Sequence, residues 1–238
     1  MPSGAIEEIQ GTSLKNMAFY NEISVEYDAI LDKESSNEIV RKRVREKFTE
    51  LVKPGHVLDF GGGTGRDLDW LIQHQYQVVF CEPSEGMRQK AIDRYKNSPS
   101  ADRVTFLGND QTDFTTWREQ PPFSVKTDAI LTDFAVINCI ADIGLLFETF
   151  AQLIKPGGHL IVLMLNSRYK KTWRWKLREQ IRSFVSGKPA VIHVQYNNYR
   201  QIVHLYSLKH IKAAASASFE LRSHEDLFEF TLFHFIRK

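Results

Sequence analysis

The stretch from Val57 to Asp67, which reads Val-Leu-Asp-Phe-Gly-Gly-Gly-Thr-Gly-Arg-Asp, constrains the fold of this chain most strongly. An apolar run leads into it, and a run with helical spacing leaves it. Four glycines stand between them within five positions. Glycine has no Cβ, so it adopts positive φ and lets the backbone approach a ligand closely. Strand, glycine-rich turn and helix N-terminus, in this order, hold nucleotide-like ligands in α/β folds. The stretch therefore predicts a cofactor site.

Strand and helix patterns alternate along the middle of the chain. We expect strands at 56–60, 77–81, 104–107, 127–132 and 159–165. Helical patterns lie between them, over 66–75, after a capping Ser84, and over 143–155. This alternation predicts an α/β fold, a doubly wound parallel sheet with helices on both faces. Right-handed crossovers place the C-terminal ends of all these strands at one edge of the sheet, where such folds bind ligands.

The two ends of the chain have different patterns. Ser35-x-x-Glu38 is a capping-box sequence, and apolar residues at helical spacing follow it until Pro54-Gly55. The segment from Met17 to Leu31 carries aromatic residues among charges and is predicted to be a short helix or a lid. The last third is predicted to hold β-rich stretches within 190–206, a helix over 207–218 and a terminal hairpin.

Composition sets further bounds. The 238 residues are 42% hydrophobic, enough for one buried α/β domain with an added lid. A net charge of +2 does not demand a nucleic-acid or membrane partner. Cys81 and Cys139 sit in apolar runs and are predicted to be buried thiols, which fits a reducing cytoplasm. No apolar run is long enough for a membrane span, and Met1 to Gln10 shows no signal pattern. We therefore expect a cytoplasmic protein, and the sequence leaves a homodimer open.

Two details around the glycine turn narrow the ligand. A dinucleotide fingerprint starting at Gly61 requires a small residue at its third position, where this chain has Arg66. Asp59 lies two residues before Gly61, and its carboxylate would repel a pyrophosphate. An acidic residue there suits a ligand with a cationic end, such as an amino group or a sulfonium. The eight histidines show no zinc spacing, so no metal site is predicted.

Further polar residues at the same edge complete the expected ligand. Glu82 ends the second strand and is placed to accept hydrogen bonds from both hydroxyls of a ribose. Asp110 follows the third strand and could bond an adenine amino group, while Met87 and Phe134 could enclose the ring. The inferred ligand has a cationic tail, a ribose and a base.

Five segments in order resemble the successive motifs of class I S-adenosylmethionine-dependent methyltransferases. The resemblance spans residues 17–165 and is specific as a series, although no single segment is. It implies a Rossmann-like, mostly parallel sheet of seven strands that ends in an antiparallel pair, with S-adenosylmethionine as cofactor. The segments are 57–67, 79–87, 104–110, 128–138 and 153–164.

The resemblance assigns residues around the methionine portion of that cofactor. Gly61, Gly63 and Gly65 would form the turn beneath it. Asp59 would hold its amino group, often through water, and Asp133 would sit beside the methyl donor.

The resemblance also assigns residues around the nucleoside. Glu82 would take the ribose hydroxyls, Pro83 and Met87 would line the adenine slot, and Asp110 would meet the adenine amino group.

The regions outside the core take their roles from the same resemblance. Tyr20 and Tyr27 match aromatic positions that close over the cofactor. We therefore divide the chain into a helical lid segment, an α/β core that binds the cofactor, a cap over the acceptor pocket and terminal antiparallel strands. Their bounds are 1–52, 53–165, 166–212 and 213–238.

The predicted function is in-line methyl transfer from S-adenosylmethionine to a small-molecule acceptor. Alignment of donor and acceptor in a dry pocket can supply most of the catalysis, so no catalytic residue is assigned. An NAD(P)-dependent oxidoreductase of Rossmann type is one alternative, and Asp59 and Arg66 argue against it. A non-catalytic regulatory module that binds the cofactor is another, and the intact acidic and glycine positions argue against that. The segment 133–136 lacks the Asn/Asp-Pro-Pro-aromatic pattern that grips a flipped base, so no nucleic-acid partner is expected.

A basic segment at 168–182 has apolar residues at helical spacing beside its charges. The pattern favours an amphipathic helix with a solvated basic face. Two alternatives stay open: part of the cap that attracts an anionic substrate, and a contact with a membrane surface.

Overall fold

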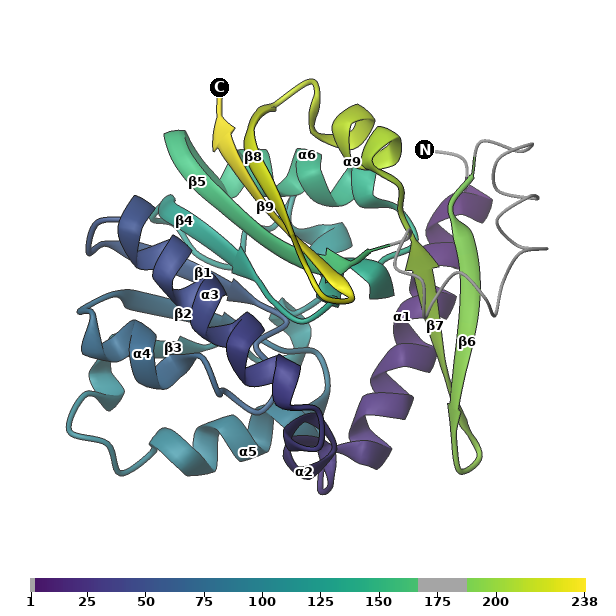
Figure 1. The fold of residues 1–238 in the computed structure, drawn as a ribbon, viewed down its shortest axis with the longest axis horizontal. Coiled ribbons are helices and arrows are strands. Elements are labelled where there is room, and N and C mark those ends of the chain that lie inside the picture. Colours follow the sequence, from purple (N-terminus) through teal and green to yellow (C-terminus); the bar gives the residue numbers. More distant parts are fainter. Residues whose placement is uncertain (1–2, 167–187) are drawn as a thin grey trace.

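A seven-stranded sheet forms the centre of the protein (Figure 1). The structure is a computed structural model, and it describes residues 3–166 and 188–238. The predicted basic segment at 168–182 lies outside the described residues. The strands follow the spatial order β3-β2-β1-β4-β5-β9-β8. They are β1 His56–Phe60, β2 Gln77–Cys81, β3 Val104–Phe106, β4 Thr127–Thr132, β5 Ile154–Leu165, β8 Phe219–Leu227 and β9 Phe230–Arg237.

Strand pairing confirms the predicted fold class. The pairs β1–β2, β2–β3, β1–β4 and β4–β5 are parallel. The terminal hairpin is antiparallel and adds to the edge of β5 through β9. The sheet order reverses beside β1, because β2 lies on one side of it and β4 on the other. A crevice at this reversal point is where open α/β sheets bind ligands.

Helices cover both faces of the sheet, and the alternation of strand side chains divides the core. Val57 and Ala129 face one apolar layer, while Leu58 and Ile130 face the other. The first layer packs against α3 Ser35–Leu51, α4 Leu68–Gln73 and α5 Glu85–Tyr95, and the second against α6 Ile143–Leu153 and α9 Leu208–Ala215. The described residues also form four short 3-10 helices: η1 Ala101–Arg103, η2 Asn109–Gln111, η3 Phe114–Thr116 and η4 Val136–Cys139.

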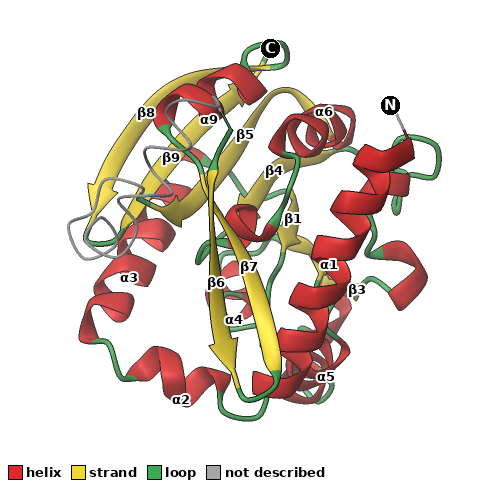
Figure 2. Ribbon diagram, turned by 90° about the vertical axis from the view of Figure 1, so that its right-hand side faces the viewer, coloured by secondary structure: helices red, strands yellow, loops and turns green. Residues whose placement is uncertain are grey.

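The N-terminal helices and a separate hairpin lie beside the core. The helices are α1 Ser3–Ile23 and α2 Tyr27–Asp32, and the hairpin pairs β6 Ala190–Tyr196 with β7 Tyr199–Leu205. Figure 2 shows the hairpin alongside α1. Asn16 joins them: its amide donates to the carbonyls of Cys139 and Ile202 at 3.0 Å each and accepts from the Ile202 N–H at 2.7 Å.

Two helix starts were predicted from capping sequences, with different outcomes. Ser84 caps α5 as predicted, since its hydroxyl accepts from the Met87 N–H at 3.4 Å. The prediction of a capping box at Ser35 and Glu38 is wrong. Ser35 is already the first helical residue of α3, and the N-cap position falls to Glu34, which makes no side-chain cap. Only Lys33 and Glu34 separate α2 from α3, so the chain reaches helical geometry before Ser35 can act as a cap.

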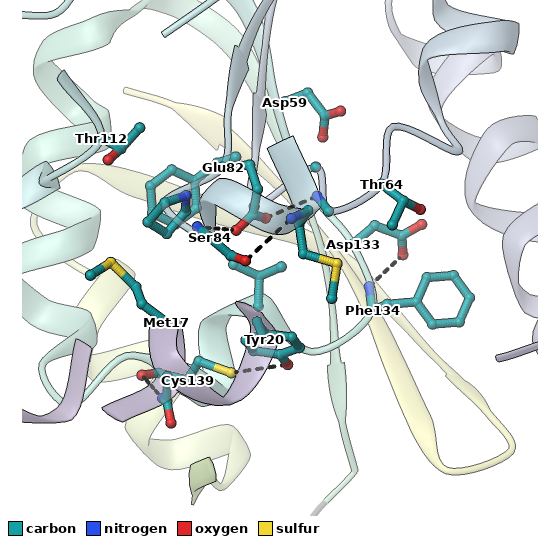
Figure 3. Close-up of a pocket in the computed structure, with 18 of the residues that line it drawn as sticks. Met17, Tyr20, Asp59, Thr64, Glu82, Ser84, Thr112, Asp133, Phe134 and Cys139 are labelled. Atoms are coloured by element: carbon teal, nitrogen blue, oxygen red, sulfur yellow. Dashed lines mark hydrogen bonds between the residues drawn. The ribbon is translucent and has the colours of Figure 1, made fainter. Parts of the chain in front are cut away.

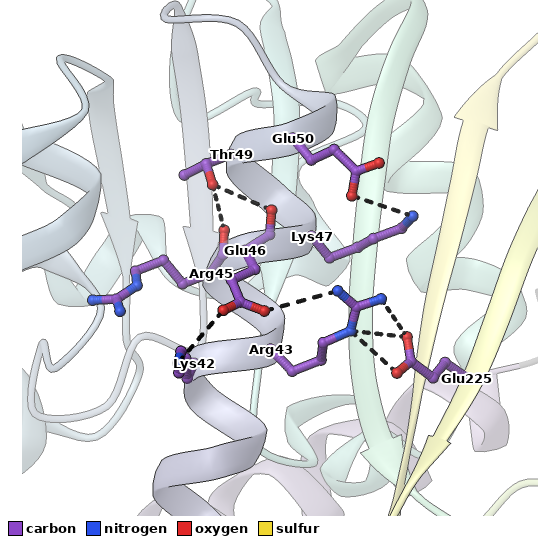
Figure 4. A network of polar contacts seen from close by, with 8 residues as sticks. All are labelled: Lys42, Arg43, Arg45, Glu46, Lys47, Thr49, Glu50 and Glu225. Carbon is purple, nitrogen blue, oxygen red and sulfur yellow. Dashed lines mark hydrogen bonds and ion pairs between the residues drawn. The ribbon is translucent and has the colours of Figure 1, made fainter.

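A charged network ties α3 to the terminal hairpin (Figure 4). Arg43 donates two hydrogen bonds from Nε and one from Nη2 to the carboxylate of Glu225, over 2.9 to 3.1 Å. Its Nη1 also lies 3.9 Å from Glu46, one turn further along the helix. Exposed pairs of this kind contribute at most about 1 kcal/mol, so the network orients α3 more than it stabilises the fold.

Two stacked histidines, one on β5 and one on β9, are expected to make the stability of the fold depend on pH. His159 Nδ1 and His234 Nε2 lie 3.0 Å apart, and burial together with His159 lowers the pKa of His234 to about 4. Between the ordinary histidine pKa and this value the unfolded chain binds a proton that the folded chain does not. We expect the free energy of unfolding to fall by about 1–2 kcal/mol between pH 7 and pH 4 through this residue.

Urea denaturation at both pH values tests this expectation. His234→Gln should flatten the dependence, while His56→Gln, at an exposed position, should leave it unchanged. An equally steep loss of stability in His234→Gln would show that other groups cause it.

Candidate functional site

A cavity opens at the C-terminal edge of the parallel strands, between the glycine turn, α1, α2 and η4 (Figure 3). Nine of the residues predicted to bind the cofactor line it, and the structure thus brings together segments that are far apart in sequence. They are Tyr20, Tyr27, Asp59, Gly61, Gly63, Glu82, Pro83, Met87 and Asp133.

The glycine turn leaves β1 with left-handed backbone geometry. Gly61 has φ of +77° and its N–H donates to the Cys81 carbonyl at 2.7 Å. Gly63 has φ of +59°, and a Cβ there would lie 3.9 Å from the ring of Tyr27. Because Tyr27 also lines the cavity, any side chain at Gly63 would enter the space between turn and lid.

Two predicted residues do not line the cavity. Gly65 packs the turn against α5, because a Cβ there would come within 2.9 Å of the Ala91 side chain. Asp110 is exposed on η2. The neighbouring Asn109 accepts a hydrogen bond from buried Arg88, which ties this turn to α5. The cavity wall after β3 is formed instead by Thr112, Asp113 and Phe114, which sequence reasoning missed.

Glu82 ends β2 with its carboxylate held by backbone donors. Oε1 accepts from the Ser84 N–H at 2.7 Å, and Oε2 accepts from the Gly63 N–H at 3.0 Å. Burial raises the pKa of Glu82 to about 7 despite these two donors. Each carboxylate oxygen has two lone pairs, so both retain the capacity to accept a ligand hydroxyl. This geometry suits a diol.

Arg41 also lines the cavity and was missed by sequence reasoning. It comes from α3, and its Nη1 donates to both oxygens of Asp67 at 2.7 and 2.8 Å. The same atom lies 3.9 Å from Asp133, and the guanidinium stacks 4.3 Å above the ring of Phe134. Neither Arg41 nor Asp67 stands out in the sequence, because only the packing of α3 on the sheet brings them together.

Asp59 and Asp133 each have a buried oxygen that accepts no hydrogen bond. Asp59 is 1% exposed and its Oδ2 has no hydrogen-bond donor. Asp133 accepts from the Phe134 N–H at 2.8 Å through Oδ1, while its Oδ2 has none. Burial and neighbouring carboxylates raise the pKa of both groups. Buried polar groups normally find partners, so these oxygens indicate a ligand that supplies N–H donors and positive charge.

The backbone after β4 is strained beside these carboxylates. Phe134 and Ala135 have φ of +42° and +67°, in the left-handed region. Such residues cost roughly 1–3 kcal/mol each and gather at functional sites. The turn places Phe134 beneath Arg41 and leads into η4, which forms the next part of the wall.

A third group of polar side chains faces the cavity from the side of α1. Tyr20 Oη lies 3.6 Å from Cys139 Sγ. Gln201 of β7 donates to Tyr20 Oη at 2.7 Å and to the sulfur of Cys139 at 3.4 Å. Cys139 and Gln201 were not predicted, since nothing local in the sequence connects η4 with the β6–β7 hairpin.

The described residues contain neither a metal-binding cluster nor a membrane-spanning helix. No group of three or more His, Cys, Asp and Glu there could hold a metal ion. Within the same residues, no helix has the length and apolar character required to cross a membrane. Both cysteines are free thiols, Cys81 buried and Cys139 half-buried.

Comparison with known proteins agrees with the geometry. A family described as a methyltransferase domain matches residues 34–221. This chain belongs to that methyltransferase family. Among curated proteins, an uncharacterised methyltransferase of Geobacillus kaustophilus is 30% identical over 129 residues, which are 52% of this chain and 53% of that protein. The tRNA 5-carboxymethoxyuridine methyltransferase of Escherichia coli is 28% identical over 47% of this chain and 40% of its own length. The chain thus spans about half the length of these curated relatives.

Solved methyltransferase structures share the fold of this chain over nearly its whole length. DhpI, solved with SAH, has a TM-score of 0.70 and 15% identity, covering 96% of this chain and 97% of DhpI. The 1,6-didemethyltoxoflavin-N1-methyltransferase of Burkholderia thailandensis, solved with bound 1,6-didemethyltoxoflavin and S-adenosylhomocysteine, has a TM-score of 0.69 and 12% identity. The alignment covers 97% of this chain and 90% of the Burkholderia chain.

Proposed function

We propose that this methyltransferase moves the methyl group of S-adenosylmethionine to a small-molecule acceptor. The observation that carries the proposal is the surplus of buried carboxylates at the edge of the glycine turn. Asp59 and Asp133 have oxygens without donors, and Arg41 is the cation among them. A nicotinamide dinucleotide would bring a pyrophosphate to this acidic end, whereas an amino acid ammonium and a sulfonium bring positive charge.

The cavity offers one place for each part of the cofactor. Asp59 and Asp133 would accept from the ammonium, and Arg41 would pair with the carboxylate of the same amino acid end. Glu82 would accept from the ribose hydroxyls, and buried Met87 would line the adenine slot. When bound, the cofactor supplies an activated methyl group, and these side chains orient it.

Pro83 would share the adenine slot with Met87, and Gly61 and Gly63 would let the backbone pass close to the methionine portion. Gly65 would act only through the shape of the turn. Asp110 would need its turn to move before it could reach the adenine.

The lid and the cap would shape the acceptor side. Tyr20 and Tyr27 meet edge to face with ring centres 6.0 Å apart, and both line the cavity. Gln201 brings the β6–β7 hairpin into contact with Tyr20 and Cys139, which supports its role as part of a cap. This wall holds hydroxyl, thiol and amide groups and apolar side chains, so we favour an acceptor of small size that carries no strong charge.

An RNA acceptor is a second candidate, because one relative acts on tRNA. The cavity favours the small molecule. Among the described residues, the cations that line it are Arg41 and Arg66, and both are engaged by acidic side chains at 2.7 Å. Nucleic-acid binding depends on cations that are free to meet phosphates. The free thiols support a cytoplasmic location, which is part of the same proposal.

Binding and transfer assays test the function in two steps. Calorimetry should show S-adenosylhomocysteine binding and no comparable binding of NAD. Methyl-labelled S-adenosylmethionine is then offered with a small-molecule extract and, separately, with bulk tRNA. Label in small molecules supports the proposal, whereas label in tRNA selects the second candidate. Binding of NAD alone would reject both.

Polar contacts hold α2 over the cavity, and we expect it to act as a lid. The helix has no buried residue. Asp28 accepts from the Thr64 hydroxyl at 2.6 Å and pairs with Arg94 at 3.0 Å. Asp28→Asn should weaken these two contacts of α2 with the core. S-adenosylhomocysteine should therefore dissociate about twofold to fivefold faster in stopped-flow measurements. Asp93→Asn removes the exposed pair with Lys96 and serves as control. Equal rates in all three proteins would show that α2 does not gate the cavity.

A further inference from the structure

Among the described residues, the carboxylates around Arg41 outnumber the cations that could neutralise them. Arg41 contacts Asp67 at 2.7 Å and Asp133 at 3.9 Å, and Asp59 completes the group from β1. The three aspartates are at most 7% exposed, so water cannot screen their mutual repulsion. One guanidinium cannot balance three buried carboxylates, and such groups share protons instead.

We propose that Asp59, Asp67 and Asp133 store a proton around Arg41 while the site is empty, and that the ammonium of the cofactor displaces it on binding. The inference rests on the proposed function, because it takes the amino acid end of S-adenosylmethionine as the arriving cation. The proton leaves as the ammonium donates to the carboxylate oxygens, and it passes to the buffer. No other bond changes.

The surroundings of the three aspartates agree with a shared proton. Burial raises the pKa of Asp59 and of Asp133. Asp67 and Asp133 raise the pKa of Asp59 further, Asp67 raises that of Asp133, and Arg41 lowers both. The negative charge of Glu82, at the end of β2, raises the pKa of Asp59 further. Tyr27 faces the group from α2, and burial raises its pKa, so it stays neutral. No histidine among the described residues lines the cavity.

The direction of the pH effect follows from proton counting. The empty protein binds more protons than the complex, so raising the pH favours the complex. For one displaced proton, affinity rises by up to about tenfold per pH unit while the cluster remains protonated in the empty protein. At higher pH, where the empty cluster has already lost the proton, affinity levels off.

Calorimetry of S-adenosylhomocysteine binding near pH 7 measures the proton directly. This ligand keeps the ammonium, which is fully protonated at that pH, and lacks the sulfonium. Observed enthalpies in phosphate and in Tris differ by the number of protons released multiplied by the difference in buffer ionisation enthalpy. We expect about 0.5–1 proton released per ligand bound. Binding with equal enthalpies in both buffers would overturn the stored proton and leave the proposed function intact. Absence of binding would overturn both.

Three variants locate the proton. Asp133→Asn keeps the size of the side chain but cannot share a proton, so release should fall to near zero. Glu82→Gln removes the other cavity carboxyl whose pKa burial raises, and shows whether that group releases the proton instead. Asp93→Asn, on the exposed face of α5, is the control that should leave release unchanged. Release lost in Glu82→Gln but kept in Asp133→Asn would overturn the assignment. If Asp133→Asn does not fold or bind, Asp67→Asn takes its place with the same expected loss.

Discussion

Gly63→Val is expected to lower the affinity for S-adenosylhomocysteine by at least about 100-fold, roughly 3 kcal/mol. Two causes act together. A β-branched residue at φ of +59° is strained, and its side chain would point toward Tyr27 in the space where the cofactor is proposed to lie. The Gly63 N–H also donates to Glu82, so a shifted turn would release that carboxylate. Isothermal calorimetry with the purified variant gives the affinity.

Gly157→Val is the matched control for Gly63→Val. Gly157 also has positive φ, +76°, but nothing lies within 4 Å of a Cβ there, on the turn that leads into the regular part of β5. This variant carries similar backbone strain away from the cavity. It should therefore lose some stability and keep full affinity. Unchanged affinity in Gly63→Val would place the cofactor elsewhere.

Glu82→Ala is expected to weaken binding by about 10-fold to 100-fold, or roughly 1.5–3 kcal/mol, because the ribose hydroxyls lose a charged acceptor. The same change leaves the N–H groups of Gly63 and Ser84 without their acceptor. Both N–H groups shape the walls of the cavity, so part of the effect acts through the turn itself.

Glu85→Ala provides the comparison for Glu82→Ala. Glu85 is exposed in the first turn of α5, three residues from Glu82. The Glu85→Ala variant should therefore bind the ligand with unchanged affinity. An adenosine titration separates the two causes for Glu82, since it retains the ribose and lacks the amino acid end. If Glu82→Ala binds S-adenosylhomocysteine as tightly as the unmodified protein does, Glu82 does not hold the ribose.

The parallel core could be predicted from sequence because its signals are local. β1, β2 and β4 begin and end at the expected residues, since apolar runs bounded by turn residues define each of them. The glycine turn, Asp59 and Glu82 converge as expected, because parallel strands with right-handed crossovers bring these ends to one edge. The terminal hairpin was also predicted correctly, as β8 and β9.

The rest of the site could not be predicted because it depends on contacts between distant elements. Arg41 reads as one charge among many on α3 until the helix packs beside Asp67 and Asp133. Gln201 meets Tyr20 across 181 positions of sequence. Asp110 follows β3 as expected, but it is exposed and does not line the cavity. Its neighbour Asn109 accepts a hydrogen bond from Arg88, a contact that the local sequence does not indicate.

Asn16 has a consequence for how the protein fluctuates. One amide side chain joins α1, η4 and β7 through three hydrogen bonds, and among the described strands β6 pairs only with β7. In hydrogen–deuterium exchange, the amides of α1 and of the two-stranded sheet should therefore open as one cooperative unit, separate from the seven-stranded core. Entry of an acceptor would then be governed by the rate at which this unit detaches.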